Sequence, residues 1–339
     1  MAPAVTIRPF VYADLEPARW LIYRAYVQAI VQLYGKDSAT GYEVRSTSFM
    51  ALYIRRDPQG CFVAVAPDDT LVGAVFCFVW GEVGWFGSLA VAPEWQGRGV
   101  GQALTDQAVH YLEGRGCRRV GLETWPHSPL VRHLYGKFGF QPVRPTIKFS
   151  RAVSRVASDD HGEAGDVSWT SGQHGGRSAP TVAAVAAVHD VTLAQRGTMP
   201  GEPAVDYRAE VAVPLEAGWA ELAIAHDAGG QALGYALCYR KRPGGGPAVA
   251  LDARLLGIRP GGEAAATLDR LLAACDAQAR IAGVASVTVD VNLRYSYAAG
   301  LLRARNFRPV YELLRMEREL PGFDPLARSG VVDCSRWAG

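Results

Sequence analysis

The chain has 339 residues, which is longer than one typical domain and predicts two. Hydrophobic residues make up 49% and charged residues 20%, the balance of an ordinary soluble globular protein with sizeable cores. The net charge of +2 and the even spread of basic residues argue against a nucleic-acid-binding protein, and no apolar run is long enough to span a bilayer. Because the N-terminus also lacks the apolar stretch of a signal peptide, we expect a cytoplasmic protein.

The cysteines carry no sign of metal or redox chemistry. None of the six lies in a CxxC or similar spacing, and most fall in apolar patterns, where buried structural thiols are the usual finding. We predict neither a metal site nor disulfides. The six are Cys61, Cys77, Cys117, Cys238, Cys275 and Cys334.

The elements expected before residue 85 are strands and helices in alternation. Asp14 can cap the first helix, and Gly35 can end it. The predicted order is a strand at 5–10, a helix up to residue 35, a loop and second helix within 36–58, and a hairpin formed by 61–66 and 71–80.

The next stretch, WFGSLAVAPEWQGRGVG, predicts an anion site. An apolar strand at 85–91 ends at Pro93, and a glycine-rich turn leads into a helix. Backbone N–H groups at a helix start have no internal partner, and glycines let a phosphate approach closely. We therefore expect a pyrophosphate here, with a plain tight turn as the alternative reading. The predicted contacts are Gln96, Gly97, Arg98, Gly99, Val100 and Gly101.

The elements after the turn complete a strand–helix–strand crossover. The helix continues to about residue 114, and a strand follows at 120–125, which a connection of this length places parallel to the strand at 85–91. Ser128 and Pro129 are a capping residue and a first-turn proline, so they predict the start of a short helix that carries Tyr135. The last strands of this half are expected within 140–149.

These motifs resemble those of the GNAT acyltransferase superfamily. The family pattern [QR]-x-x-G-x-[GA] is met by Gln96, Gly99 and Gly101, and HLYGKFGFQPV at 133–143 is similar to the family's second motif. The resemblance implies an α/β fold, a mixed sheet in which two parallel strands splay apart and helices flank them. It implies acetyl-CoA bound in the notch, with pantetheine paired to the main chain of Leu89, Ala90 and Val91. It also implies that residues 36–58 help to form the acceptor site; we add Ser128 to the cofactor-binding residues.

The second half of the sequence repeats the first. LAVAP at 89–93 matches LGIRP at 256–260, and GFQPV at 139–143 matches NFRPV at 306–310, both at an offset of 167 residues. We therefore predict two tandem folds of the same class. The expected division is an N-terminal catalytic domain at 1–150, a linker at 151–165, a C-terminal copy at 166–320 and a tail at 321–339.

The second copy has lost the residues of the anion site. At the same offset Glu263 replaces a glutamine, Ala266 and Leu268 replace two glycines, and Leu302 replaces Tyr135. A carboxylate repels a pyrophosphate, and a leucine would crowd the backbone amides. The C-terminal copy is therefore expected to be degenerate.

The chemistry implied by the resemblance is direct attack of an amine on the thioester. An alkylamine, with a pKa of about 10.4, must lose a proton and the leaving thiolate must gain one. Tyr135 matches the family position for the acid. Glu123 is the first choice for the base, although strand alternation leaves open which face it takes; a water chain is the alternative. Aromatic residues on nearby elements could line the acceptor pocket or belong to the core: Tyr42, Trp80, Trp85 and Trp125.

The sequence thus favours an acetyl-CoA-dependent N-acetyltransferase. Its acceptor would be a small-molecule or protein amine, and a second copy of the chain is left open as a partner. A non-catalytic acyl-CoA sensor or interaction scaffold is the competing hypothesis, and an acyl donor longer than acetyl is a third.

Overall fold

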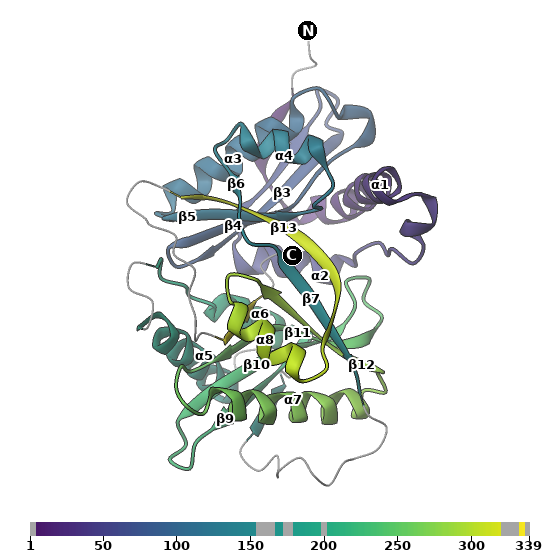
Figure 1. Cartoon of the computed structure of the whole chain (residues 1–339). Coiled ribbons are helices and arrows are strands. Elements are labelled where there is room, and N and C mark those ends of the chain that lie inside the picture. The colour runs from purple at the N-terminus through teal and green to yellow at the C-terminus, as the bar shows by residue number, and fades with distance from the viewer. Residues whose placement is uncertain (1–4, 154–166, 172–178, 198–201, 320–331, 336–339) are drawn as a thin grey trace.

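The computed structural model describes residues 5–153, 167–171, 179–197, 202–319 and 332–335. Figure 1 shows two bodies of strands and helices stacked one above the other, with two strands, β7 and β13, running between them. Parallel and antiparallel strands occur in the same sheet, which confirms the predicted mixed α/β class. Within the described residues, no helix is both long and apolar enough to cross a membrane.

The first half follows the predicted element order. Its elements are β1 (Thr6–Pro9), η1 (Tyr12–Asp14), α1 (Leu15–Tyr34), η2 (Lys36–Ala39), α2 (Thr47–Arg56), β2 (Cys61–Val65), β3 (Leu71–Trp80), β4 (Val83–Val91), η3 (Pro93–Trp95), α3 (Val100–Gly114), β5 (Arg119–Thr124), α4 (Pro129–Gly136), β6 (Gln141–Pro142) and β7 (Thr146–Ala152).

The second half presents a similar series. Its elements are β8 (Val167–Ser171), α5 (Ala179–Gly197), α6 (Arg208–Glu216), β9 (Ala220–His226), β10 (Ala232–Lys241), β11 (Pro247–Ile258), α7 (Ala264–Ile281), β12 (Ser286–Asn292), α8 (Ser296–Ala304), β13 (Arg308–Glu319) and β14 (Val332–Ser335). The offset of 167 residues carries the first residue of β5 onto that of β12, and the first residue of α4 onto that of α8. The repeat seen in the sequence is therefore also a repeat of structure.

The two halves exchange a strand. β7, from the first half, pairs with β12 of the second, whereas the last six residues of β13 pair with β5 of the first. The sheet therefore runs continuously in the order β1-β2-β3-β4-β5-β13-β7-β12-β11-β10-β9-β8. The offset of 167 carries Thr146–Ala152 of β7 onto residues 313–319 of β13, so the exchanged strands are equivalent members of the repeat.

The exchange bears on the predicted domain boundaries. Residues 1–150 and 166–320 divide the chain along its sequence, but residues 146–152 and 314–319 pair in the sheet of the other half. Of the predicted linker, residues 154–165 lie outside the described residues. Of the predicted tail, only residues 332–335 are described.

A buried ion pair accompanies each exchanged strand. Arg315 of β13 lies 2.8 Å from Glu123 of β5, with side chains 1% and 0% exposed. Lys148 of β7 lies 3.0 Å from Asp290 of β12. The offset of 167 relates Glu123 to Asp290 and Lys148 to Arg315, so the same cation-to-carboxylate contact is made twice. Each cation also has a second carboxylate nearby, Asp252 at 2.8 Å from Lys148 and Glu317 at 4.0 Å from Arg315.

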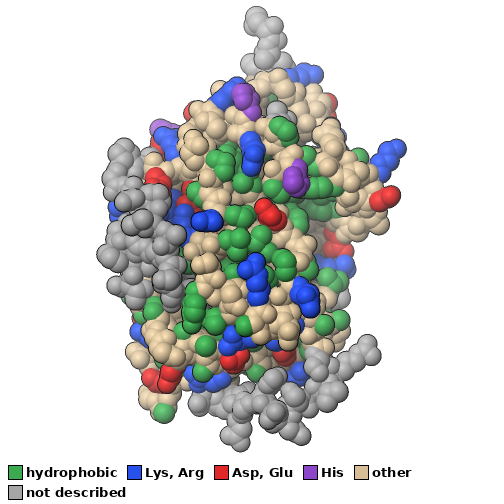
Figure 2. All heavy atoms as spheres, in the orientation of Figure 1, with side chains coloured by type: hydrophobic (Ala, Val, Ile, Leu, Met, Phe, Trp, Pro, Cys, Tyr) green, Lys and Arg blue, Asp and Glu red, His purple; other side chains and the backbone are tan. Residues whose placement is uncertain are grey.

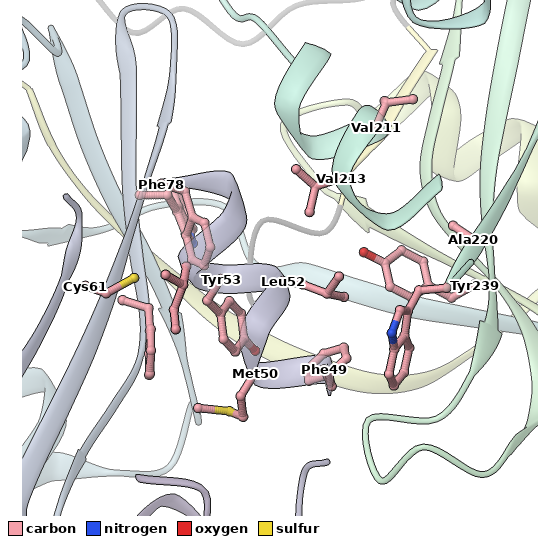
Figure 3. Packing of buried hydrophobic residues seen from close by; sticks show 14 of the residues in the cluster. Phe49, Met50, Leu52, Tyr53, Cys61, Phe78, Val211, Val213, Ala220 and Tyr239 are labelled. Atoms are coloured by element: carbon pink, nitrogen blue, oxygen red, sulfur yellow. The ribbon is translucent and has the colours of Figure 1, made fainter. Parts of the chain in front are cut away.

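A common hydrophobic core joins the halves. In Figure 3, Phe49 and Leu52 of α2 face Tyr239 and Val213 of the second half, and all of these residues belong to one buried cluster. Arg56, at the end of α2, lies 3.1 Å from Glu210 and donates to the hydroxyl of Tyr239. The contact is thus both apolar and ion-paired, and α2 is packed on both sides.

Two local expectations differ in outcome. The first helix ends at Gly35 as predicted, but the Asp14 side chain makes no capping bond to it. Instead its carboxylate accepts from Arg8 at 2.7 Å and from the Val11 amide at 2.8 Å, so Asp14 ties the helix entry to β1. The expectation that the cysteines are buried thiols is confirmed for five of them: Cys61, Cys77, Cys117, Cys238 and Cys275. The side chain of Cys334 lies outside the described residues.

Gly121 allows β5 to pass over the Trp85 ring, and this yields a stability prediction. A Cβ at Gly121 would lie 2.0 Å from Trp85 Cζ3, and that ring is fully buried. Gly121→Ala should therefore lower the free energy of unfolding by about 1–3 kcal/mol or more, because the ring cannot move without disturbing the core. Urea unfolding measures this, with Gly114→Ala as the control, since a Cβ there meets nothing within 4 Å. Equal stability of both variants would contradict the close approach.

Candidate active site

The site begins where β4 and β5 separate. The two strands pair in parallel only over Val83–Trp85 and Arg119–Gly121. Beyond this point β4 has a bulge, marked by a register shift against β3 and by Ser88 at a φ of 51°. Bulges re-aim a strand and are common beside active sites. The splayed parallel pair expected from the sequence is therefore present.

A cavity of about 1440 Å³ opens at this notch, and both halves line it. From the first half come residues of α1, β4, β5, the glycine turn and α4. From the second half come Arg242, Pro243, Val249, Arg254 and residues 310–313. In the space-filling view of Figure 2, hydrophobic side chains gather near the centre of the face between the two halves, with Lys and Arg side chains beside them.

The glycine turn forms one end of the cavity. Gly97 and Gly99 have φ values of 73° and 85°, and a Cβ at either would meet no heavy atom within 4 Å. The helical ladder of α3 begins with the bond from the Ala103 amide to the Gly99 carbonyl, so the amides of residues 100–102 precede it. The positive end of α3 and open space therefore coincide, which suits a phosphate group.

Other residues of the turn take distinct places. Gln96 donates to the Val91 carbonyl at 3.1 Å, so its side chain holds the turn against the end of β4. Gly101 lines the cavity close to Val91 and Leu134. Arg98 is exposed and lies over the Trp95 ring at 5.3 Å, outside the cavity lining.

For Val100 and the last residues of β4, the predicted contact with the cofactor is a contact of the main chain. The side chain of Val100 is packed in the core at 2% exposure, which leaves only its amide for a ligand. Leu89, Ala90 and Val91 line the cavity as the last residues of β4. β4 no longer pairs with β5 at these residues.

Tyr135 lies on α4 and lines the same cavity. Ser128 begins this helix and accepts a hydrogen bond from the Val131 amide, as the sequence predicted. The Tyr135 ring packs edge-on against Phe86 at 5.8 Å and is 7% exposed. Burial and the neighbouring Tyr26 phenol raise the pKa of Tyr135 above its ordinary value of about 10. The phenol is therefore protonated at neutral pH and available as a donor.

Glu123 lies in the cavity wall. The strand pattern did not predict which face of the sheet it would take. Its Oε1 accepts from Arg315 Nη2 at 2.8 Å and from Thr146, both on the exchanged strands. Its Oε2 has no hydrogen-bond partner among the described residues. The carboxylate is thus fixed in orientation by one oxygen, while the other is buried behind the cavity wall, since the side chain is 0% exposed.

Sequence reasoning missed a cluster of Tyr26, Arg45 and Ser88. Arg45 donates to the Ser88 hydroxyl, and the hydroxyl of Tyr26 bonds both of these residues. All three line the cavity, next to the β4 bulge. The adjacent Gly87 and Ser88 inside an apolar strand are a signal of a bulge that could have pointed here. Nothing local in the sequence marks Tyr26 or Arg45.

The aromatic candidates separate into two groups. Tyr42 and Trp125 line the cavity, and Trp125 meets the Tyr26 ring edge-on at 5.2 Å. Trp80 and Trp85 are core residues, at 4% and 0% exposure. Residues within 41–49 also line the cavity, and their role at the acceptor side stays a prediction. No group of three or more His, Cys, Asp or Glu in the described part of the chain is placed to hold a metal ion.

The second copy is built differently at the corresponding helix. Leu268, at the position of Gly101, is fully buried in the core of the second half, and Ala266 is exposed. α7 begins at Ala264, about one turn before the position that corresponds to the start of α3. The Leu268 side chain therefore fills space in the core. The sequence instead predicted that it would crowd the approach of a phosphate.

Comparisons with known proteins agree with this geometry. Residues 27–140 match the Acetyltransferase (GNAT) family. A mycothiol acetyltransferase from Rhodococcus jostii is 32% identical over 108 residues, which is 28% of this chain and 34% of the relative. The match thus spans about a third of that relative's length.

Solved structures resemble the whole chain. A putative acetyltransferase from Pyrococcus horikoshii is 17% identical with a TM-score of 0.63, covering 98% of this chain and 95% of that one. A tandem GNAT protein from the clavulanic acid biosynthesis pathway is 16% identical with a TM-score of 0.58, covering 95% and 100%. Residues 27–140 therefore match the GNAT family of acetyltransferases, and the fold of the whole chain, including its tandem architecture, has counterparts among solved structures.

Proposed function

We propose that the first half is an N-acetyltransferase that moves an acetyl group from acetyl-CoA to a primary amine. The observation that carries the proposal is that the splayed notch, the glycine turn and Tyr135 all face one cavity. The match of residues 27–140 to the GNAT family adds the reaction class. We propose a cytoplasmic enzyme whose acceptor is a small-molecule or protein amine rather than a nucleic acid.

The residues present suit acetyl-CoA as the acyl donor. The amides at 97–101 would hold the pyrophosphate, since the space beside Gly97 and Gly99 is open. The main chain of Leu89–Val91 would pair with the pantetheine amides as an added strand does. Gln96 and Ser128 support the ends of this cleft, Gln96 by bonding β4 and Ser128 by starting α4.

The chemical step needs one proton removed and one supplied. The amine nitrogen forms a bond to the thioester carbonyl carbon, the C–S bond breaks, and sulfur leaves as a thiolate. Tyr135 would protonate the thiolate, since its phenol is neutral at pH 7. Glu123 Oε2 would accept the amine's proton through water, because Oε1 is fixed by Arg315 and Oε2 is buried.

The acceptor would enter from the side of the cavity lined by the second half. Tyr42 and Trp125 offer aromatic surface, and Arg242 lies 2.7 Å from Glu43 where the two halves meet. An amine on an apolar or aromatic body suits this wall better than a strongly charged one. The second half therefore contributes acceptor contacts in place of a second catalytic centre.

The stoichiometry of acetyl-CoA binding tests the proposal. We expect calorimetry to give one site per chain, and Gly99→Glu to abolish it, because the new carboxylate would stand where the pyrophosphate binds. Ala266→Glu is the matched control at the equivalent position of the second half and should leave one site. Circular dichroism checks that both variants fold.

The other outcomes decide between the hypotheses. Two sites in the wild-type chain would contradict a single working cleft, and no binding would overturn the acyl-CoA proposal. Binding without turnover across a panel of amines would favour the acyl-CoA sensor or scaffold. Competition between acetyl-CoA and longer acyl-CoAs tests the third hypothesis, a longer acyl donor.

A further inference from the structure

The last described strand, β14, lies against elements of the second half that correspond to the active-site elements of the first half. β14 pairs antiparallel with β11, and the register joins Leu255 to Ser335 and Ile258 to Val332. β14 also contacts β12 and α8. These three elements are the second-half equivalents of β4, β5 and α4, which enclose the cavity of the first half.

The equivalence extends to the register of the parallel strands. β11 and β12 pair only over Leu251–Ala253 and Val287–Val289, as β4 and β5 do over three residues. A register shift in β11 at Arg254 then follows, close to the position that corresponds to the bulge in β4. The second copy therefore has a splayed notch of its own.

The chain itself occupies that notch. The offset of 167 carries Leu255–Ile258, which pair with β14, onto Ser88–Val91 of β4. Three of those residues, Leu89–Val91, are the ones assigned to the pantetheine arm in the proposed function. We propose that the second cleft is a strand-binding site filled in cis by residues 332–335, which stand where the first cleft would hold an acyl-CoA.

Backbone hydrogen bonding supplies the physical reason. Where β11 leaves β12, its N–H and C=O groups would otherwise face the notch without partners, and buried unpaired backbone groups are costly. An added strand satisfies them whatever its side chains, and a tethered strand does so at high effective concentration. An extended peptide is therefore the ligand class of this cleft.

The start of α7 agrees with a cleft that no longer holds a phosphate. Arg305, just after α8, bonds the Ala265 carbonyl at 3.0 Å and both carboxylate oxygens of Asp269. Glu263 is the residue just before this helix, so a carboxylate stands at its N-terminus. The second half has thus both lost the glycines of the turn and filled its cleft.

Hydrogen exchange in the full chain tests the proposal. The cleft-facing amides within residues 255–258 should be protected without any ligand, and those within residues 88–91 should become protected only when acetyl-CoA is added. A full-length variant carrying Asp333→Pro and Cys334→Pro should expose the cleft-facing amides of β11 to exchange roughly 100-fold or more faster, because a proline donates no backbone hydrogen bond. Unchanged exchange at 255–258 in this variant would overturn the proposal.

A peptide added in trans provides a second measurement. A fluorescent peptide of residues 330–337 should bind the double-proline chain and restore protection at 255–258, while the same peptide with prolines at 333 and 334 should not. The wild-type chain, whose cleft is filled, should bind neither peptide. Failure of the wild-type peptide to bind the variant would count against a strand-binding cleft.

The comparison with pantetheine rests on the proposed function, but the two fail separately. If acetyl-CoA gave no protection at 88–91, the acyl-CoA proposal would fail while the proline and peptide results still decided the occupancy of the second cleft. If the cleft-facing amides of β11 exchanged like those of an unpaired strand edge, the proposal for the second cleft would fail. The acyl-CoA proposal for the first half would be unaffected.

Discussion

Tyr135→Phe should lower kcat by about 10²-fold or more while leaving the Kd for acetyl-CoA nearly unchanged. The ring keeps its packing against Phe86 and Phe140, so the variant removes only the hydroxyl. Without that donor the CoA sulfur must leave as an unprotonated thiolate. Steady-state kinetics gives kcat, and calorimetry gives the affinity for the donor.

The control for this prediction is another tyrosine with a defined hydroxyl contact. Tyr111 lies on α3, away from the cavity, and its hydroxyl donates to Asp57 at 2.7 Å. Tyr111→Phe should therefore leave kcat unchanged. If Tyr135→Phe weakened acetyl-CoA binding and spared kcat, Tyr135 would be a packing residue. If the wild-type chain acetylated no amine, that result would favour the acyl-CoA sensor hypothesis.

Glu123→Gln should lower kcat by about 10²-fold or more, and the repeat offers a matched variant to interpret it. Glu123 and Asp290 occupy equivalent positions, and each pairs with a cation on an exchanged strand. The amide keeps the shape of Glu123 but cannot accept the amine's proton. Asp290→Asn disturbs the same type of ion pair in the second half, where the proposed reaction does not take place.

Comparison of the two variants separates chemistry from stability. Each variant removes one carboxylate charge from a cation and should lower the free energy of unfolding, by up to about 3–5 kcal/mol for Glu123→Gln. The loss should be smaller for Asp290→Asn, because Lys148 keeps Asp252 at 2.8 Å. Only Glu123→Gln should also lower kcat in protein that is still folded. Equal loss of activity in both variants would assign Glu123 a structural role, and the base would then be a water chain.

Much of the fold was predictable because local signals agreed. The glycine turn, the end of α1 at Gly35 and the Ser128 cap are short-range features whose physics is complete within a few residues. The repeat offset then predicted a second copy of the same fold in the second half. The same offset located the positions at which the second copy departs from the first.

The rest depended on contacts between distant residues. Strand patterns do not tell which sheet a strand joins, so the pairing of β13 with β5 was not predictable. For the same reason the orientation of Glu123 was left open, since it is set by Arg315, 192 residues away. The cluster of Tyr26, Arg45 and Ser88 likewise combines a helix, a loop and a bulge.

The exchanged strands also bear on the order in which the chain can fold. The first sheet lacks its neighbour to β5 until residues 314–319 are synthesised, because nothing nearer in sequence takes that place. Non-local pairings of this separation slow folding, since a long loop must close before the contact forms. A nascent chain that has emerged only through its first half therefore carries an open edge along β5, the strand that holds Glu123. The active site therefore cannot be completed before β13 has been synthesised, and each half depends on a strand of the other.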